Sequence, residues 1–309
     1  MLKDPETGKP LPNAYVLDNT SKGYGWSFNF TLNAQPFEWM SLMAAYTHTV
    51  SKELTGMPGS DASSAFTYIP SYEGPNSVML HNSQFVTPDR IVASATIHDK
   101  SNNHYSIIYE TWRGGNNTTY LVQNDINADG FTYDVAYIPT DAQVAGNFDA
   151  NGNWTGKGDF RFISADDQQR FMDFVHNCDY LADRQGKYAE AYSDYSPWVH
   201  RIDFSYKHDF KLNVGKTKHT LQIGFDMKNV LNFFDSSWGV QKIANLDYSS
   251  APSNGVQYSR IIKYERMDAE GYPVFSTPAS ISGNTTKWKP YHSLGQCWYA
   301  SIGIKYFFN

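Results

Sequence analysis

The segment 124–134, NDINADGFTYD, has the residue types and spacing of a calcium-binding loop. Asp125, Asn127 and Asp129 stand at the first, third and fifth positions of such a loop, and a glycine follows where a sharp turn is needed. The glutamate expected at the twelfth position is absent, so Asp134 would have to substitute for it. The spacing therefore makes these residues candidates for a structural calcium site, while an Asx-rich turn closed by its own backbone is the favoured interpretation, and no other cofactor is expected.

Aromatic side chains make up 16% of the chain, and several of them fall in long polar segments where a ligand could reach them. Their flat faces stack on sugars and on peptide side chains, so they are candidates for ligand contact. The alternative is an interfacial belt combined with ordinary loop packing. The residues that we expect in ligand-binding loops are Trp112, Tyr120, Tyr133, Trp154 and Trp238.

Catalytic motifs are absent from the sequence, which contains no HExxH, no cysteine cluster, no GxSxG and no phosphate-binding loop. His200 and His208 are eight residues apart and form no recognisable constellation. We therefore predict no catalytic residue and no enzyme activity. The net charge of −6 and the lack of a basic stripe argue against nucleic acid as a partner. Cys178 and Cys297 are two isolated cysteines, and a bridge between them is the less favoured alternative.

Period-2 alternation predicts the strands that position these residues. It is clearest in WVHRIDFSYKHDF, residues 198–210, where apolar and charged residues fall on opposite faces. One face carries His200, Ile202, Phe204, Tyr206, His208 and Phe210, and the other carries Arg201, Asp203, Ser205, Lys207 and Asp209. The other predicted strands are 22–33, 37–50, 89–97, 104–112, 221–231 and 296–308.

The lengths of the connections alternate between short and long. Short turns are expected near 35–36, 99–102 and 212–218, and long polar segments at 51–87, 113–196 and 233–294. A charged face opposite an apolar face that ends in aromatic residues is typical of strands with water on one side and lipid on the other. The pattern therefore predicts an all-β fold, an antiparallel transmembrane β-barrel with long extracellular loops. A soluble antiparallel sandwich is the alternative.

One segment, 164–192, departs from the strand pattern. Ser164 is a suitable helix N-cap, followed by two aspartates in the first turn. Apolar side chains then recur at helical spacing, which predicts a loop helix that packs one face on the mouth of the barrel. This face comprises Phe171, Phe174, Val175 and Cys178.

About seven predicted strands cannot close an antiparallel barrel, because an odd number leaves two edges unpaired in lipid. The start of the sequence also lacks a basic region followed by an apolar one, as a signal peptide would have. We therefore expect residues 1–309 to be the C-terminal portion of a larger barrel. Residues 1–21 would be part of an extracellular loop, and 22–309 the strands and loops.

The end of the chain resembles the C-terminal targeting signal of outer-membrane barrels, which the barrel-assembly machinery recognises. The matching residues are Ser301, Gly303, Tyr306 and Phe308. Longer stretches resemble TonB-dependent receptors of the Oar-like and SusC-like branch, over nearly the whole chain. These stretches are WVHRIDFSYKHDF, LQIGFDMKNVLNFF, EGPNSVMLHNSQFVTPDR, FTYDVAYIP and HSLGQCWYASIGIKYFFN.

This resemblance implies a barrel of about 22 strands with an N-terminal plug domain, which this chain lacks. It also implies TonB-dependent uptake of a scarce nutrient, a glycan, peptide or chelate, across the outer membrane of a Gram-negative bacterium. The implied partners are outer-membrane lipid, the barrel-assembly machinery, the TonB system acting through the plug, and a surface lipoprotein lid. A passive porin-like channel and a secreted sugar-binding β-sandwich remain as alternatives. In the barrel, the residues expected to face the plug or solvent are Arg201, Asp203, Lys207, Asp226 and Lys228.

Overall fold

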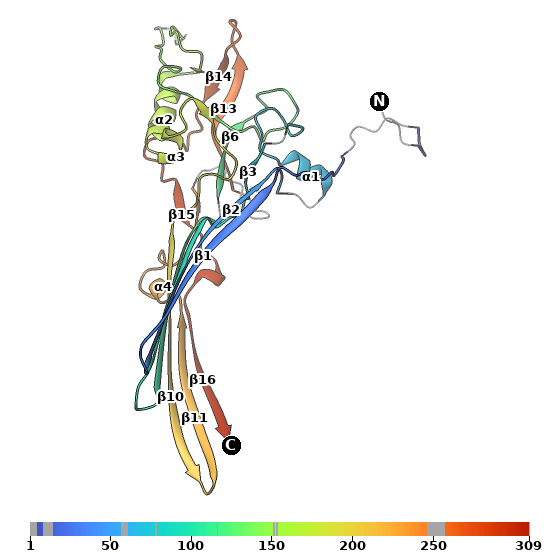
Figure 1. Cartoon of the computed structure of the whole chain (residues 1–309). Helices are drawn as coiled ribbons and strands as arrows, with labels where there is room; N and C mark the ends of the chain where they lie inside the picture. The colour runs from blue at the N-terminus through green and yellow to red at the C-terminus, as the bar shows by residue number, and fades with distance from the viewer. Residues whose placement is uncertain are drawn as a thin grey trace.

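The computed structural model has a long curved β-sheet with a folded cap at one of its ends (Figure 1). It describes residues 5–8, 15–56, 61–77, 79–115, 117–150, 152, 154–245 and 257–308. Most of the regular structure is β, and antiparallel pairing dominates. None of the helices in these ranges has both the length and the apolar character needed to cross a bilayer.

The long sheet is built from seven antiparallel strands, each paired with the next one along the chain apart from the short strands of the cap. The prediction of about seven alternating strands is confirmed, in the predicted order. A two-residue strand, β3 (His81–Asn82), adds to the end of β2. The seven strands are β1 (Tyr24–Phe37), β2 (Met40–Glu53), β4 (Asp89–His98), β5 (Asn103–Arg113), β10 (Val199–Val214), β11 (Thr217–Lys228) and β16 (Tyr299–Phe308).

Two of the short turns lie elsewhere than predicted. The first strand continues through Pro36 and ends at Phe37, with an irregular register after Ala34. Pro36 is compatible with this position because β1 lies at the edge of the sheet, where a missing N–H breaks no ladder bond. The β10–β11 hairpin is tighter than the predicted 212–218, because pairing continues to Val214 and Thr217 around Gly215, which has a φ of 63°.

The register places charged and apolar side chains on opposite faces of the sheet, as the alternation predicts. Arg201 lies opposite Glu110, and the Asp203 carboxylate pairs with Lys228 at 2.7 Å. The other face carries large apolar side chains that nothing in the described chain covers, with Trp26 52% and Ile302 77% exposed. An apolar surface this continuous is unusual for a soluble monomer.

The cap is formed by described parts of the three long segments that connect strands of the sheet, within 54–88, 114–198 and 229–298. Its main sheet has the order β6-β13-β14-β8, with parallel pairing between β6 and β13 and between β14 and β8. The elements of the cap are α1 (Ala62–Thr67), β6 (Thr118–Gln123), β7 (Tyr137–Ile138), β8 (Arg161–Phe162), α2 (Ala165–His176), α3 (Asp179–Ala182), β9 (Lys187–Tyr188), β12 (Lys242–Ala244), β13 (Gln257–Met267), β14 (Pro273–Ser276) and β15 (Trp288–Pro290). The short helix α4 (Val230–Phe234) lies beside the long sheet below the cap, where it contacts β10, and the 3₁₀ turn Leu294–Gln296 precedes β16 (Figure 1).

Helix α2 confirms the predicted loop helix, although it ends at His176, well before residue 192. The Ser164 hydroxyl accepts a hydrogen bond from the Asp167 N–H at 3.1 Å, which caps the first turn. Arg170 pairs with Asp166 and Asp167, and donates to backbone carbonyls of the third cap segment. The predicted apolar face, Phe171, Phe174, Val175 and Cys178, is buried in the cap core.

The cap core joins segments that are far apart in sequence. Tyr120 and Val122 from β6 pack with Ile261 and Ile262 from β13, and with the apolar face of α2. The long loops are therefore a folded unit with its own hydrophobic core, where the sequence indicated only polar connections and one helix.

Replacing Phe171, which is fully buried, by alanine should lower the free energy of opening of the cap by about 3–5 kcal/mol. The reason is the loss of buried apolar area together with the cavity left in the core. Hydrogen exchange of the α2 amides measures this free energy directly. The exposed Gln169→Ala on the same helix should change it by less than about 0.5 kcal/mol. Equal protection in both variants would contradict the assignment of the cap core.

Candidate functional site

The polar face of the sheet ends in a hollow beneath the cap. Its volume is about 290 Å³, and its lining includes Glu110, Arg201, Asp203 and Lys228. Arg201 is held by three further contacts: hydrogen bonds to the Gly239 carbonyl at 2.8 Å and to the Gln296 side chain at 3.3 Å, and the Trp112 ring at 5.1 Å. The fixed charges of both signs, open to solvent, suit a hydrated passage or the contact surface of another domain.

The five residues predicted to line the lumen share one face of the sheet. Arg201, Asp203 and Lys207 alternate along β10, while Asp226 and Lys228 alternate along β11. Asp226 lies opposite Ser205 on one side and Ser301 on the other. The polar face is thus continuous from β5 to β16.

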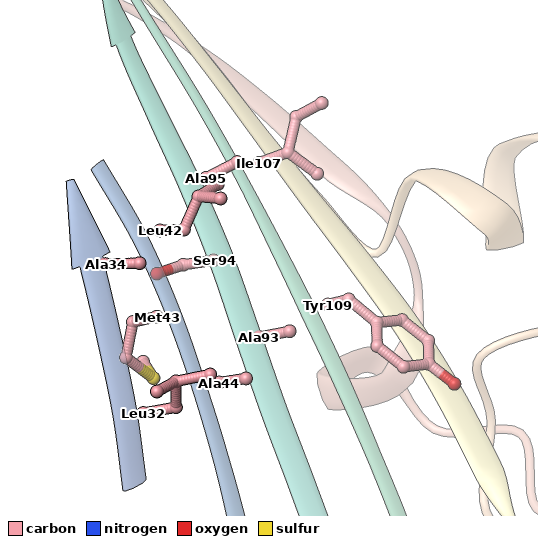
Figure 2. A pocket seen from close by; sticks show the side chains of 10 residues that line it. All are labelled: Leu32, Ala34, Leu42, Met43, Ala44, Ala93, Ser94, Ala95, Ile107 and Tyr109. Atoms are coloured by element: carbon pink, nitrogen blue, oxygen red, sulfur yellow. The ribbon is translucent and has the colours of Figure 1, made fainter. Parts of the chain in front are cut away.

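The apolar face carries a shallow hollow over strands β1, β2, β4 and β5 (Figure 2). Its volume is about 440 Å³. The hollow exists because four alanines lie between larger neighbours, so the surface drops where their side chains end. The alanines are Ala34, Ala44, Ala93 and Ala95, and the larger apolar neighbours are Leu32, Leu42, Ile107 and Tyr109.

The predicted barrel-assembly residues lie on β16 at one edge of the sheet. Ser301 and Gly303 belong to the polar face, and Tyr306 and Phe308 to the apolar face, where they are 58% and 71% exposed. The Tyr306 hydroxyl is hydrogen-bonded to the His219 ring of β11. The alternation that defines the signal is therefore the same alternation that separates the two faces.

The predicted calcium loop is folded as an Asx-rich turn. The Asp125 carboxylate accepts from the N–H groups of Asp129 and Gly130, at 3.2 and 2.8 Å. Asp134 accepts from the Ile126 N–H at 3.3 Å and from the Asn127 amide at 3.1 Å. Within the ranges that the structure describes, no three His, Cys, Asp or Glu side chains are arranged to hold a metal ion. Calcium binding at Asp125, Asn127, Asp129 and Asp134 stays a prediction.

The electrostatics of this turn favour a positive charge. Burial and, to a smaller extent, the nearby carboxylates of Asp129 and Asp125 together raise the pKa of Asp134 to about 6. One oxygen of Asp129 is buried without a hydrogen-bond partner. Gly74 passes so close to this carboxylate that a β-carbon on Gly74 would lie 2.5 Å from it. Several acidic groups are thus packed together against neutral donors.

The aromatic residues predicted to bind a ligand occupy different environments. Tyr120 is fully buried in the core of the cap, while Trp154 is half-buried and packs on Phe148. Trp112 packs on Arg201, and Tyr133 on Tyr68 at 5.1 Å. Trp238 is 52% exposed and is the member of the set with the most accessible ring. The structure does not bring the five together.

A buried polar cluster joins residues that the sequence did not connect. Asp194 accepts from the Tyr120 hydroxyl at 2.5 Å and pairs with Lys287 at 2.9 Å, while the Cys178 thiol lies 3.5 Å from the same ammonium group. Burial raises the pKa of both Tyr120 and Cys178. Both cysteines are free, so the Cys178–Cys297 bridge considered from the sequence is not formed. The cluster ties three distant chain segments inside the cap, which no local motif could indicate.

Comparisons of the chain with protein-family models, with curated proteins and with solved structures found no match.

The acidic turn that contains Asp134 predicts that the free energy of unfolding of the cap depends on pH. Because folding raises the Asp134 pKa from 3.8 to about 6, the folded cap binds a proton more tightly than the unfolded chain does. The contribution of Asp134 to the free energy of unfolding of the cap should therefore fall as pH rises from about 4 to about 6, by up to about 3 kcal/mol, and then level off. Urea unfolding at a series of pH values measures this slope, and Asp134→Asn should remove it.

The same titration with calcium chloride tests the predicted metal site. A bound cation favours the ionised carboxylates, so calcium should reverse the slope and stabilise the cap above about pH 6. Potassium chloride at equal ionic strength is the control. Identical slopes in the two salts would contradict calcium binding, while a flat profile without calcium would contradict the assigned proton linkage.

Proposed function

We propose that this chain is part of a transmembrane β-barrel of a TonB-dependent outer-membrane receptor, and that it takes part in the uptake of a scarce nutrient. The observation that carries the proposal is the division of one continuous sheet into a polar face and an uncovered apolar face. The two faces require different solvents. Water on the polar face and lipid on the apolar face meet this requirement without any other covering element.

The dimensions of the apolar face support a membrane-spanning role. Trp298 precedes β16 and Phe308 ends it, both on the apolar face. About ten residues at about 3.3 Å each, tilted by about 40°, span about 25 Å, the usual height of the apolar band of an outer-membrane barrel. Aromatic residues gather at the end away from the cap, for example the stacked Phe37 and Trp39, as expected of an interfacial girdle.

The directions of the edge strands support a larger barrel. Strands β1 and β16 both run away from the cap, so pairing them directly would give a parallel contact in an antiparallel sheet (Figure 1). An odd number of further strands between these edges would restore antiparallel pairing all round. A closed sheet would also satisfy the backbone groups along both exposed edges, which lipid cannot hydrogen-bond.

The cap supports the assignment of a receptor rather than a simple channel. It is a folded unit with its own core at one end of the sheet, which suits a ligand-capturing surface on the outside of the cell. The TonB system, the plug domain and a lid lipoprotein enter this proposal only through the sequence resemblance. So do the barrel-assembly machinery and the class of nutrient.

The proposal is tested by deleting the gene in its host and growing the strain on defined glycans, peptides or metal chelates as limiting nutrients. We expect the deletion strain to lose growth on one of these classes. The intact gene should restore this growth, but not in a strain that lacks the TonB system. Growth that is independent of TonB but dependent on the gene would favour the passive porin-like channel.

A charge on the apolar face should be costly, while the same charge on the polar face should be tolerated. Ile302→Arg should destabilise the lipid-inserted barrel by about 2–4 kcal/mol, because Ile302 lies near the middle of the apolar band. Ser301→Arg, the adjacent residue, points to the opposite face beside Asp226 and should cost less than about 1 kcal/mol. Urea unfolding of the protein in lipid vesicles measures both. Equal costs for the two variants would contradict lipid contact on this face.

A further inference from the structure

The cap contains a small pocket whose walls come from all three of its segments. Tyr72 belongs to the first segment, Asp134, Tyr137 and Tyr188 to the second, and Ile262 and Phe275 to the third. The cavity has a volume of about 60 Å³. By the usual allowance per water molecule, this space holds a group of a few heavy atoms and not a whole sugar or amino acid.

Three tyrosine rings form the mouth and one wall of this tyrosine pocket. Tyr72 and Tyr188 are stacked with ring centroids 4.8 Å apart, and Tyr137 meets Tyr188 edge-on at 5.3 Å. Tyr72 is 37% exposed and Tyr188 42% exposed, so the rings are accessible from solvent. The faces of aromatic rings are electron-rich and attract a cation held over them.

One buried carboxylate completes the wall. Asp134 is 2% exposed, and its hydrogen bonds come from neutral donors, the Ile126 N–H and the Asn127 amide. Among the described residues, no Lys, Arg or His forms an ion pair with Asp134. A buried carboxylate without a cation is costly, and a bound positive charge would offset that cost.

Several carboxylates lie near the pocket, while the Arg184 guanidinium, which donates to the Tyr188 carbonyl at 2.7 Å, is itself paired with Glu190 at 2.9 Å. Burial raises the pKa of Tyr188, and the charges of Asp134 and Glu73 contribute to the same shift, which places both carboxylates near the ring. Asp125 and Asp129 lie on the other side of Asp134. The potential in the pocket is therefore negative, and it would attract a cation from solution.

The floor of the pocket decides which cation fits. Ile262 and Phe275 are buried apolar residues, and they offer no oxygen ligand to a hydrated metal ion. A short alkyl stem packs well on such a floor while its charged end contacts the carboxylate and the rings. A quaternary ammonium carries its charge inside a shell of methyl groups and has no N–H to donate to the Asp134 carboxylate.

We propose that the tyrosine pocket binds a primary ammonium group on a short alkyl stem, with Asp134 as its counter-ion and Tyr72, Tyr137 and Tyr188 as its aromatic walls. A lysine side chain or an aminoalkyl substituent presents this chemistry. A role of the pocket in selecting cargo rests on the proposed function. In that role, the pocket would direct uptake toward ligands that carry an amine. Binding itself depends on the folded cap alone.

The probe for this site is n-butylammonium, with n-butanol as its neutral counterpart and tetramethylammonium as a cation of the same number of heavy atoms that has no N–H donor. Titration of the purified protein, followed by tyrosine fluorescence and by calorimetry, should show saturable binding of n-butylammonium. Binding of n-butanol and of tetramethylammonium should be at least tenfold weaker. Equal binding of n-butylammonium and n-butanol, or no saturable binding of n-butylammonium, would overturn the proposal.

A matched pair of substitutions separates the aromatic contribution from simple folding. Tyr188→Phe keeps the ring and should retain affinity within about threefold, while Tyr188→Leu loses the π face and should weaken binding at least tenfold. Asp134→Asn should also weaken it at least tenfold. Tyr291→Ala, a partly exposed cap residue outside the pocket, should leave affinity unchanged. Unchanged affinity in Tyr188→Leu would refute the aromatic site, and near-ultraviolet circular dichroism checks that each variant is folded.

The same measurements distinguish failure of the pocket from failure of the proposed function. They require a folded cap but no transport, so they are made on protein in lipid vesicles whose insertion is first verified. Absence of ammonium binding by inserted protein would reject the pocket and leave the receptor proposal standing. Binding by protein whose apolar face does not enter lipid would reject the membrane role and leave the pocket standing.

Discussion

The alternation of side chains across a hydrogen-bonded sheet is the constraint on which the rest of the structure depends. Successive residues of a strand point to opposite faces, so the register of seven strands fixes two continuous surfaces at once. A slip of one residue between β10 and β11 would move Asp226 and Lys228 onto the apolar face and expose Phe225 to the polar one. The ion pair between Asp203 and Lys228 helps to hold this register, because it forms only when the charged residues share a face.

The cap solves a different problem. Long connections need hydrogen bonds for their backbone groups and burial for their aromatic side chains. Here three long connections meet both needs by packing around a shared core with its own sheet and helix. Arg170 illustrates the principle, since one guanidinium pairs with two aspartates of its own helix and donates to carbonyls more than a hundred residues away. The buried contact of Asp194 with Lys287 and Tyr120 plays a similar part on the other side of the core.

The acidic side of the cap is where the fold leaves a charge unbalanced. Asp125, Asp129 and Asp134 are brought together by a turn that their own side chains close, and burial of Asp134 raises its pKa to about 6. The neighbouring tyrosines face the same space. A cation is the natural complement of this arrangement, whether a metal ion in the turn or an ammonium group in the tyrosine pocket, and the two differ in the ligands they need.

The sequence by itself determined the strands, their order and the identity of each face, because a period of two is a local property that neighbouring residues display directly. It also determined helix α2 and its buried face, because capping and helical spacing are equally local. Only the tertiary structure decided how the long segments fold together, since the pairing of β6 with β13 and the burial of Tyr120 depend on contacts across more than a hundred residues. The tyrosine pocket is likewise a feature that only the tertiary structure decided. Tyr72, Asp134 and Tyr188 are far apart in the chain, and nothing in their local sequence indicates that they surround one space.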